Sequence, residues 1–319
     1  MTRVAAVDCG TNSIRLLVAD LDPESGTLRS LDRRMEIVRL GQGVDRTGRL
    51  APEALERTFA ACRRYAEVVA GHGVADGRLR FVATSASRDA ENREDFVRGV
   101  KDILGVEPEV ITGDEEAGLS FTGATRELPG LPGLAPPYLV LDIGGGSTEF
   151  VLGTDGVEAA RSVDIGCVRL TERHLLEGGR LADPPSGEQI GAITADIEAA
   201  VDLAARQVPL ERAGTLVGLA GSVTTVAGIA LGLDRYDSQA IHHARIGLDQ
   251  VREVTERLLA ARHEERAAIP VMHPGRVDVI GAGALVLLTV MRRTGAREVL
   301  VSEHDILDGI AWSAAPAPS

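Results

Sequence analysis

The sequence predicts an α/β fold made of two similarly built domains, and three observations support this. Short apolar runs typical of strands alternate with longer helical patterns along the chain. A strand, a glycine-containing loop and a second strand begin at Val4, and the same pattern is repeated from Tyr138. Between the two copies, residues 128–137 contain four prolines and two glycines, which neither a helix nor a central strand accommodates. We therefore expect the main domain boundary there.

Each expected element follows from the spacing of its apolar residues. The first domain is expected to comprise residues 1–130 with a last helix at 303–314, and the second residues 137–302. Apolar runs predict strands at residues 4–7, 14–19, 79–83, 109–111, 138–141, 148–152 and 216–220. Helical spacing predicts helices at 52–69, 92–104, 114–123, 187–206, 222–231, 248–261 and 276–293, and an irregular tail at 315–319.

The composition restricts the kinds of molecule that the protein is expected to bind. The 319 residues carry a formal net charge of −13 and a single lysine, Lys101, so neither a nucleic-acid partner nor an anionic membrane is expected. A polyanionic substrate would need local arginines, backbone N–H groups or a metal ion. The three cysteines, Cys9, Cys62 and Cys167, lack metal-ligand spacing, and the apolar run at 279–291 is shorter than the roughly 20 residues of a bilayer span. With no apolar leader at the start of the chain, these features predict a cytoplasmic protein.

Two glycine loops carry the clearest chemical signal. They read Asp8-Cys-Gly-Thr-Asn-Ser13 and Asp142-Ile-Gly-Gly-Gly-Ser147. Glycine lets a backbone approach a ligand closely, and successive N–H groups in such turns bind anions, while the aspartates can hold a divalent cation. One such loop alone is more simply a hairpin turn, but two copies in matching settings favour a phosphate site. Because the glycines open a strand rather than a helix, a P-loop and a dinucleotide fingerprint are both excluded.

The duplicated unit resembles the superfamily of actin, heat-shock ATPases and sugar kinases, in which two domains each present one loop to the phosphates. Within this superfamily, several longer motifs resemble those of the exopolyphosphatase/guanosine pentaphosphate phosphohydrolase (Ppx/GppA) family. The motifs are Asp8-Cys-Gly-Thr-Asn-Ser-Ile-Arg15, Ala83-Thr-Ser-Ala-Ser-Arg-Asp-Ala90, Ile111-Thr-Gly-Asp-Glu-Glu-Ala117, Asp142-Ile-Gly-Gly-Gly-Ser-Thr-Glu149, His242-His243, Pro274-Gly-Arg-Val-Asp278 and Val301-Ser-Glu-His-Asp-Ile-Leu-Asp-Gly309.

The resemblance implies two actin-like ATPase (ribonuclease H-like) domains with an interdomain cleft, and it assigns roles to residues. It implies that Glu116 is the catalytic base and that Asp142 and Glu149, together with Asp8, hold Mg²⁺ or Mn²⁺. The expected substrate-binding residues are Asn12, Ser13, Arg15, Thr84, Ser85, Arg88, Gly144, Gly145, Gly146, Ser147 and Thr148.

The residues alone leave alternatives open at several of these positions. Glu116 could be an exposed helix carboxylate beside Glu115, and Arg15 could be a salt-bridged surface arginine. Thr84-Ser85 could simply begin a helix. The segment at 218–225 could hold a nucleotide base or pack a helix against a strand.

The expected activity is release of orthophosphate from the end of polyphosphate, with conversion of guanosine pentaphosphate as the nearest alternative. A sugar- or acetate-type kinase and a non-catalytic polyphosphate sensor are more distant alternatives. A homodimer is also expected, from the resemblance and from the general frequency of two-fold assemblies.

Overall fold

The computed structural model describes residues 1–315, and the chain divides into two compact units. Unit 1 comprises Met1–Gly123 and the chain from Ile306 onward, and unit 2 comprises Ala124–Asp305. Beyond residue 315, the irregular tail expected from the sequence lies outside the described residues. No helix among residues 1–315 is long and apolar enough to cross a membrane.

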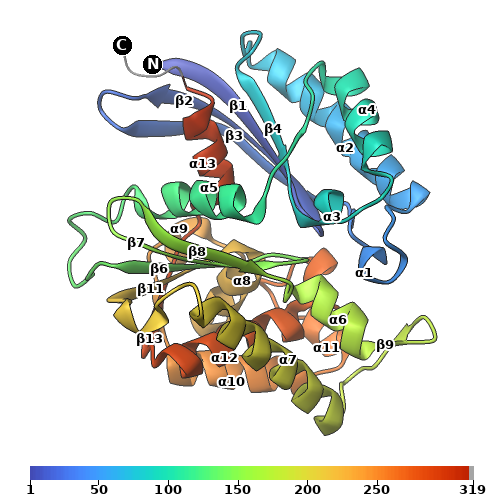
Figure 1. Cartoon of the computed structure of the whole chain (residues 1–319), viewed down its shortest axis with the longest axis vertical. Helices are drawn as coiled ribbons and strands as arrows, with labels where there is room; N and C mark the ends of the chain where they lie inside the picture. Colours follow the sequence, from blue (N-terminus) through green and yellow to red (C-terminus); the bar gives the residue numbers. More distant parts are fainter. Residues whose placement is uncertain (316–319) are drawn as a thin grey trace. The chain divides into compact units, whose positions relative to one another are not determined.

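Unit 1 is built on a five-stranded sheet of order β3-β2-β1-β4-β5 (Figure 1). Its first three strands are antiparallel, whereas β4 runs parallel to β1 and β5 parallel to β4. The strands are β1 Thr2–Cys9, β2 Ser13–Asp22, β3 Thr27–Ile37, β4 Leu79–Ala83 and β5 Glu109–Val110. The helices are α1 Val44–Thr47, α2 Pro52–Gly71, α3 Ser85–Arg88, α4 Arg93–Leu104, α5 Gly113–Thr125 and α13 Ile306–Ser313.

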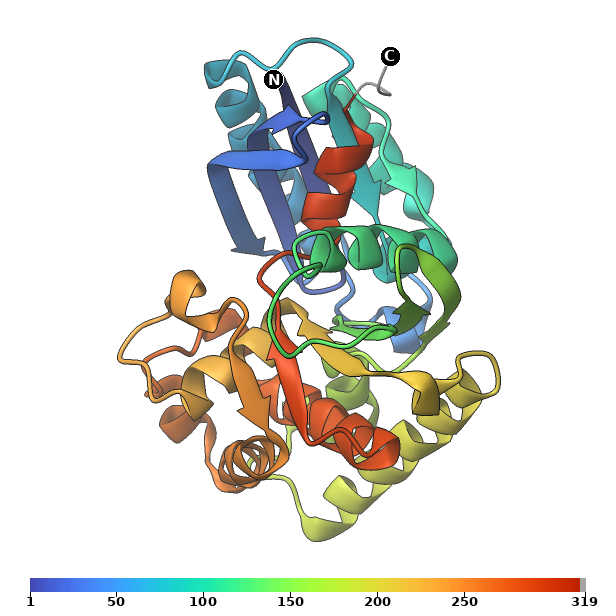
Figure 2. The same ribbon diagram turned by 90° about the vertical axis from the view of Figure 1, so that its left-hand side faces the viewer.

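The alternation of side chains along β1 explains why both faces of this sheet are covered. Ala5 and Val7 point into the core with residues of α2 and α4, while Val4 and Ala6 lie in a second core with residues of α13. Figure 2 shows α13, in red, lying along these strands. Glycine at 309 lets α13 approach α5 closely, because a Cβ there would lie 2.0 Å from the carbonyl oxygen of Leu119.

Unit 2 repeats the same strand order with one strand added. Its six-stranded sheet runs β12-β13-β11-β6-β7-β8, again with three antiparallel strands followed by parallel neighbours. The strands are β6 Tyr138–Ile143, β7 Thr148–Gly153, β8 Val157–Val163, β11 Thr215–Leu219, β12 Arg245–Gly247 and β13 Glu298–Val301, beside the short pair β9 Leu176–Glu177 and β10 Arg180–Leu181. This shared order is that of the actin-like ATPase fold predicted from the duplicated loops.

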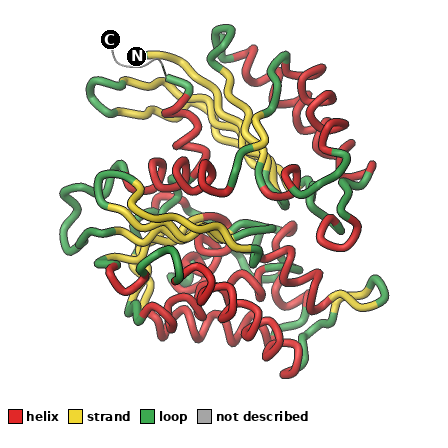
Figure 3. The backbone as a smooth tube through the Cα atoms, viewed as in Figure 1, coloured by secondary structure: helices red, strands yellow, loops and turns green. Residues whose placement is uncertain are grey.

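The helices of unit 2 enclose one large apolar core against the sheet (Figure 3). Leu139, Leu141 and Ile143 of β6 enter it at alternate positions. The helices are α6 Cys167–Leu175, α7 Gly187–Ala205, α8 Ala220–Ala230, α9 Ser238–Ile241, α10 Leu248–Ala260, α11 His263–Ala267 and α12 Ile280–Thr294.

The sequence predicted the strands next to both glycine loops and the edge strand β5, and it missed β3, β8, β12 and the inner strand β13. Strand β4 has the predicted bounds, and α4 ends at Gly105, which adopts a φ of 71° that glycine accommodates. Strands β3 and β8 were not predicted, because their half-exposed residues lack an apolar run. The helix predicted at 276–293 begins at Ile280, because Pro274–Arg276 forms a separate 3₁₀ turn. The last helix begins at Ile306 rather than at 303.

Candidate phosphate and metal site

The first glycine loop, Asp8–Ser13, binds its neighbours chiefly through carbonyl groups. The Gly10 N–H donates to the Ser13 carbonyl (2.9 Å), which closes the turn between β1 and β2. The carbonyls of Thr11 and Asn12 are engaged: Gly41 donates to Thr11 (2.8 Å), and Val38 and Arg39 donate to Asn12 (3.1 and 2.9 Å). Within residues 1–315 the N–H groups of Thr11 and Asn12 donate no hydrogen bond. The loop therefore offers donors to an anion.

The second loop, Asp142–Ser147, has the same construction. The Gly144 N–H donates to the Ser147 carbonyl (3.0 Å). The carbonyls of Gly144, Gly145 and Gly146 accept bonds from the start of α6, with Cys167 donating to Gly144 (3.0 Å) and Gly166 to Gly146 (3.1 Å). In the part of the chain that the structure describes, the N–H groups of Gly145 and Gly146 donate no hydrogen bond.

Gly166 is required for this contact between loop and helix. A Cβ at Gly166 would lie 2.2 Å from the carbonyl carbon and oxygen of Gly145, a distance that backbone atoms cannot tolerate. The Arg169 side chain adds a further bond from its Nε to the Gly146 carbonyl (2.8 Å). These supporting residues were missed at the level of sequence. The adjacent Gly-Cys pair at 166–167 gave no sign that it would meet a loop some twenty residues earlier.

The residues opposite the two aspartates differ in charge. In the β1–β2 ladder Asp8 faces Arg15, whose Nε and Nη2 both donate to Asp8 Oδ2 (2.9 and 2.6 Å). In the β6–β7 ladder Asp142 faces Glu149 instead. Residues directly opposite in an antiparallel pair project from the same face of the sheet, so unit 2 places two carboxylates side by side.

Both carboxylates of unit 2 are buried. Asp142 is 7% exposed and Glu149 1% exposed, and Ser162 of β8 donates its hydroxyl to Glu149 Oε1 (2.7 Å). Two buried negative charges repel each other strongly unless a proton or a cation accompanies them. Oxygen donors of this kind suit Mg²⁺ and Mn²⁺, so the donor set fits a hard divalent cation.

Glu116 and Arg88 form an ion pair at the end of the unit 1 sheet. Glu116, on α5, is 8% exposed, so it is not the exposed helix carboxylate that was one alternative. Arg88 Nη1 donates to Glu116 Oε2 (3.2 Å) and to the carbonyl of Ile111 (2.9 Å). Glu115 points elsewhere and accepts from the N–H and hydroxyl of Thr112 (2.9 and 3.1 Å). Those bonds lower the pKa of Glu115.

Thr84 and Ser85 follow β4 and reach the first loop, because parallel neighbours β1 and β4 end at the same edge of the sheet. The hydroxyls of Thr11 and Ser85 lie 2.9 Å apart, and both residues are buried. Thr84 precedes the short helix α3, yet its side chain makes no capping hydrogen bond. The alternative that Thr84 is a side-chain helix cap therefore lacks its defining contact.

Some expected substrate ligands are already engaged inside their own unit. Thr148 is wholly buried, and its hydroxyl donates to the Ile165 carbonyl (2.9 Å), so this side chain supports the fold. Arg15 is paired with Asp8, as one alternative held, although its side chain remains 20% exposed. Ser147 is 2% exposed.

Each unit gathers its expected site residues at one end of its sheet. In unit 1 these are Asp8, Arg15, Thr84, Ser85, Arg88 and Glu116, and in unit 2 they are Asp142, Gly144, Gly145, Gly146, Ser147, Thr148 and Glu149.

The segment at 218–225 packs tightly against its surroundings. A Cβ at Gly218 would lie 2.8 Å from Val223 Cγ1, and one at Gly221 would lie 2.3 Å from the Arg276 guanidinium carbon. Ala220, which starts α8, adopts a φ of 66°. These contacts supply a packing reason for the two glycines.

Comparison with known proteins agrees with this construction. The sequence matches the Ppx/GppA phosphatase family over residues 17–317. It is 49% identical to exopolyphosphatase 2 of Mycobacterium tuberculosis, over 99% of both chains. A crystal structure of an exopolyphosphatase-like protein shares 43% identity and a TM-score of 0.91 over 98% of each chain. The Aquifex aeolicus member of the Ppx/GppA family shares 29% identity and a TM-score of 0.77 over 98% of this chain and 97% of that one. The chain belongs to the Ppx/GppA phosphatase family.

Proposed function

We propose that this protein is an exopolyphosphatase, which releases orthophosphate from the end of inorganic polyphosphate by metal-assisted hydrolysis. The observation that carries the proposal is the buried pair Asp142 and Glu149 beside a loop whose Gly145 and Gly146 N–H groups donate no hydrogen bond within residues 1–315. Carboxylates for a cation and N–H groups for phosphate oxygens are what a phosphoanhydride substrate requires. The family supports the class of reaction, and the relatives named above support polyphosphate as the substrate.

Asp142 and Glu149 would hold the divalent cation, with Asp8 as a further candidate ligand. A bound Mg²⁺ or Mn²⁺ would neutralise charge on the phosphate oxygens. Asp8 is the weakest of the three assignments, because Arg15 already neutralises its charge. The N–H groups of Thr11, Asn12, Gly145 and Gly146 would receive phosphate oxygens, and the Asn12, Ser13 and Ser85 side chains would add polar contacts.

Glu116 would act as the general base. Its carboxylate would orient a water molecule and accept a proton from it while the water oxygen bonds to the terminal phosphorus. The bond from that phosphorus to the bridging oxygen breaks, and the shortened chain leaves with the negative charge. Arg88 would serve in two ways, since its guanidinium positions Glu116 and favours the ionised carboxylate that a base needs.

Phosphate release from polyphosphate tests the proposal. Purified protein with Mg²⁺ should release orthophosphate without any acceptor, and chelation with EDTA should stop it. Release only when a sugar or acetate acceptor is present would identify a kinase, and binding without turnover in Mg²⁺ and Mn²⁺ would identify a sensor. Competition between polyphosphate and guanosine pentaphosphate separates the two activities for which the family is named.

Two further expectations belong to this proposal. We propose a homodimer, on the strength of the family resemblance and the frequency of two-fold assemblies, and light scattering on a sizing column tests it. We also propose a cytoplasmic location. It rests on a sequence with few cysteines, all three of which are buried free thiols, and cell fractionation tests it.

A further inference from the structure

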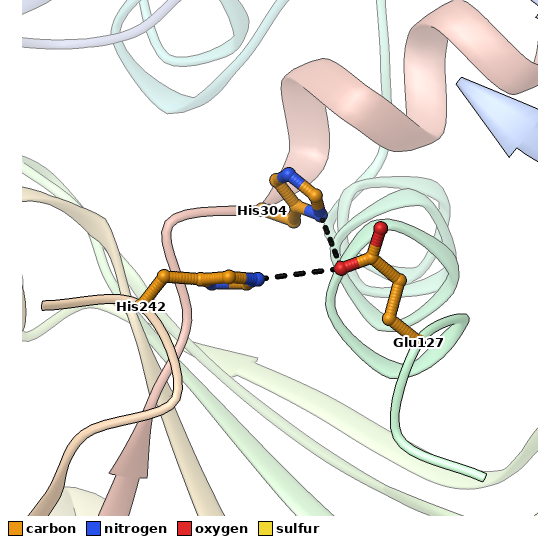
Figure 4. Close-up of side chains that lie close together, drawn as sticks. All are labelled: Glu127, His242 and His304. Carbon is orange, nitrogen blue, oxygen red and sulfur yellow. Dashed lines mark hydrogen bonds and ion pairs between the residues drawn. The ribbon is translucent and has the colours of Figure 1, made fainter. Parts of the chain in front are cut away.

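Unit 2 contains a cluster of imidazole rings around one carboxylate, apart from the glycine loop. Glu127 Oε2 lies 3.3 Å from His242 Nε2 and 3.2 Å from His304 Nδ1 (Figure 4). The ring of His243 stacks on that of His242, with centroids 3.7 Å apart and planes 29° apart. The His242 and His304 centroids lie 4.6 Å apart.

The cluster joins the two segments by which the chain enters and leaves unit 2. Unit 2 begins at Ala124 and ends at Asp305. Glu127 therefore follows the first connection closely, and His304 immediately precedes the residue that ends the unit. The contact between Glu127 and His304 ties these two connecting segments to each other, and His242, at the end of α9, braces both.

The hydrogen bonds around His242 indicate whether these side chains are joined by shared protons or by a metal ion. The three ligand atoms lie within 4.8 Å of one another, a spacing that a cation could bridge. However, the Glu303 N–H donates to His242 Nδ1 (3.1 Å), so neutral His242 carries its proton on Nε2 and donates it to Glu127. A metal on Nε2 would force that proton onto Nδ1, facing the Glu303 N–H, whereas metal-binding histidines need an acceptor there. The geometry favours shared protons.

His243 makes the stack intolerant of additional charge. Its Nε2 is buried and finds no hydrogen-bond partner in residues 1–315, and its backbone φ is 61°. Glu127 can balance one positive charge on the rings. A second proton would place charge on stacked, partly buried imidazoles, which costs free energy.

The direction of the pKa shifts agrees with this geometry. Burial, with the charges of the neighbouring rings, lowers the pKa of His242 to about 4 from its ordinary 6.5. Burial also lowers the pKa of His243. Both imidazole rings bind a proton more readily when separated from the cluster than within it. A lower pH therefore favours separation of the rings from the cluster. For His242 the destabilisation begins as the pH falls below 6.5 and is complete near 4.

We propose that this cluster is a proton-sensitive latch, which holds the two connecting segments together while His242 and His243 are neutral and opens as they take up protons. The charged and titratable groups on the segments that meet here are Arg126 and Glu127, His242 and His243, and Glu303, His304 and Asp305. The Tyr236 hydroxyl donates to Glu303 Oε1 (2.6 Å).

Hydrogen exchange at the Glu303 amide tests the latch, because that N–H is the one His242 accepts. After correction for the intrinsic rate, its protection should fall about tenfold per pH unit for each proton taken up on opening, between pH 6 and 5. His242→Asn is the matched variant: its side-chain oxygen can accept from the same N–H but does not titrate. We expect a pH slope shallower by one proton.

His243→Gly supplies a second, independent variant. It removes the imidazole whose Nε2 has no hydrogen-bond partner in residues 1–315, and glycine accommodates the backbone φ of 61°. The variant should therefore fold, and it should also reduce the pH slope. In the wild type, ¹⁵N shifts should show His242 protonated on Nε2 alone at pH 7. Equal slopes in wild type and both variants would overturn the proposal. So would stoichiometric Zn²⁺ binding at pH 7 that Glu127→Gln abolishes, because it would identify a metal site.

Discussion

The two glycine loops share one backbone and differ in the residue across the ladder. Each closes with a glycine N–H donating to a serine carbonyl, and each has its remaining carbonyls held by a neighbouring segment. Across from the aspartate, unit 1 carries Arg15 and unit 2 carries Glu149. The first pair joins opposite charges (the balanced pair), whereas the second joins two like charges (the unbalanced pair).

The difference teaches how one duplicated structure can serve two roles. Under the proposed function, the Asp–Arg pair would stabilise a loop that receives phosphate, while the Asp–Glu pair would bind the ion that accompanies the phosphate. Glu116, which Arg88 contacts, belongs to unit 1, as does the candidate ligand Asp8, whereas Asp142 and Glu149 belong to unit 2. Four experiments would break or sharpen this comparison.

Replacing the proposed base should have the largest effect. Glu116→Gln keeps an oxygen for Arg88 but cannot accept a proton, so we expect kcat for phosphate release to fall about 10²–10⁴-fold, and the loss of Arg88's counter-charge should cost about 1–3 kcal/mol in the free energy of unfolding. Glu115→Gln, its neighbour on α5, is the matched control and should keep activity within about twofold, because Glu115 bonds to Thr112. Equal kcat values for wild type and Glu116→Gln would remove Glu116 from the mechanism.

Neutralising one carboxylate of the unbalanced pair should weaken metal binding. Glu149→Gln should raise the Mg²⁺ concentration needed for half-maximal activity about 10–100-fold, and excess Mg²⁺ should restore part of the rate. In EDTA the same variant should be at least as stable as wild type, because a buried like-charge repulsion is gone. An unchanged Mg²⁺ requirement would argue against Glu149 as a ligand.

The balanced pair should respond with the opposite sign. Asp8→Asn leaves Arg15 without its counter-charge, so we expect a loss of about 1–3 kcal/mol in the free energy of unfolding, whether or not metal is present. This range allows for the solvent that reaches Arg15. Urea unfolding with EDTA and with Mg²⁺ measures both variants. If Asp8→Asn and Glu149→Gln changed stability alike in EDTA, the electrostatic contrast between the loops would be wrong.

The glycines that support the loops should differ in a smaller, graded way. Gly166→Ala places a methyl 2.2 Å from the Gly145 backbone, and overpacking of this kind costs about 1–3 kcal/mol. Gly41→Ala meets Thr11 Cγ2 at 2.3 Å and the Cβ atoms of Thr11 and Ala86 at 3.1 Å; because side-chain atoms rather than backbone must shift, its cost should be lower. Gly156→Ala has no atom within 4 Å and serves as the control. Thermal unfolding should rank the three in that order.

Prediction from sequence succeeded for those features that neighbouring residues determine by themselves. The loop words and the apolar runs of β1, β4 and β6 locate the central strands and both aspartates, because glycine spacing and strand alternation are properties of neighbouring residues. The edge strand β3 was missed, since a strand exposed on one side carries no uniform apolar run. The roles of Thr148 and Gly166 were also beyond reach, because their partners Ile165 and Gly145 become neighbours only after folding.

The sequence by itself determined the α/β class, the duplication, the family and the identity of the acidic residues, all of which depend on residue types and their spacing. Only the tertiary structure decided what each acidic residue faces. Strand register places Arg15 opposite Asp8 and Glu149 opposite Asp142 on the same face of each ladder, and the start of α6 donates to the carbonyls of the second loop. The physical reason is that charge balance and the direction of a hydrogen bond depend on distances between strands and helices, which no linear pattern records.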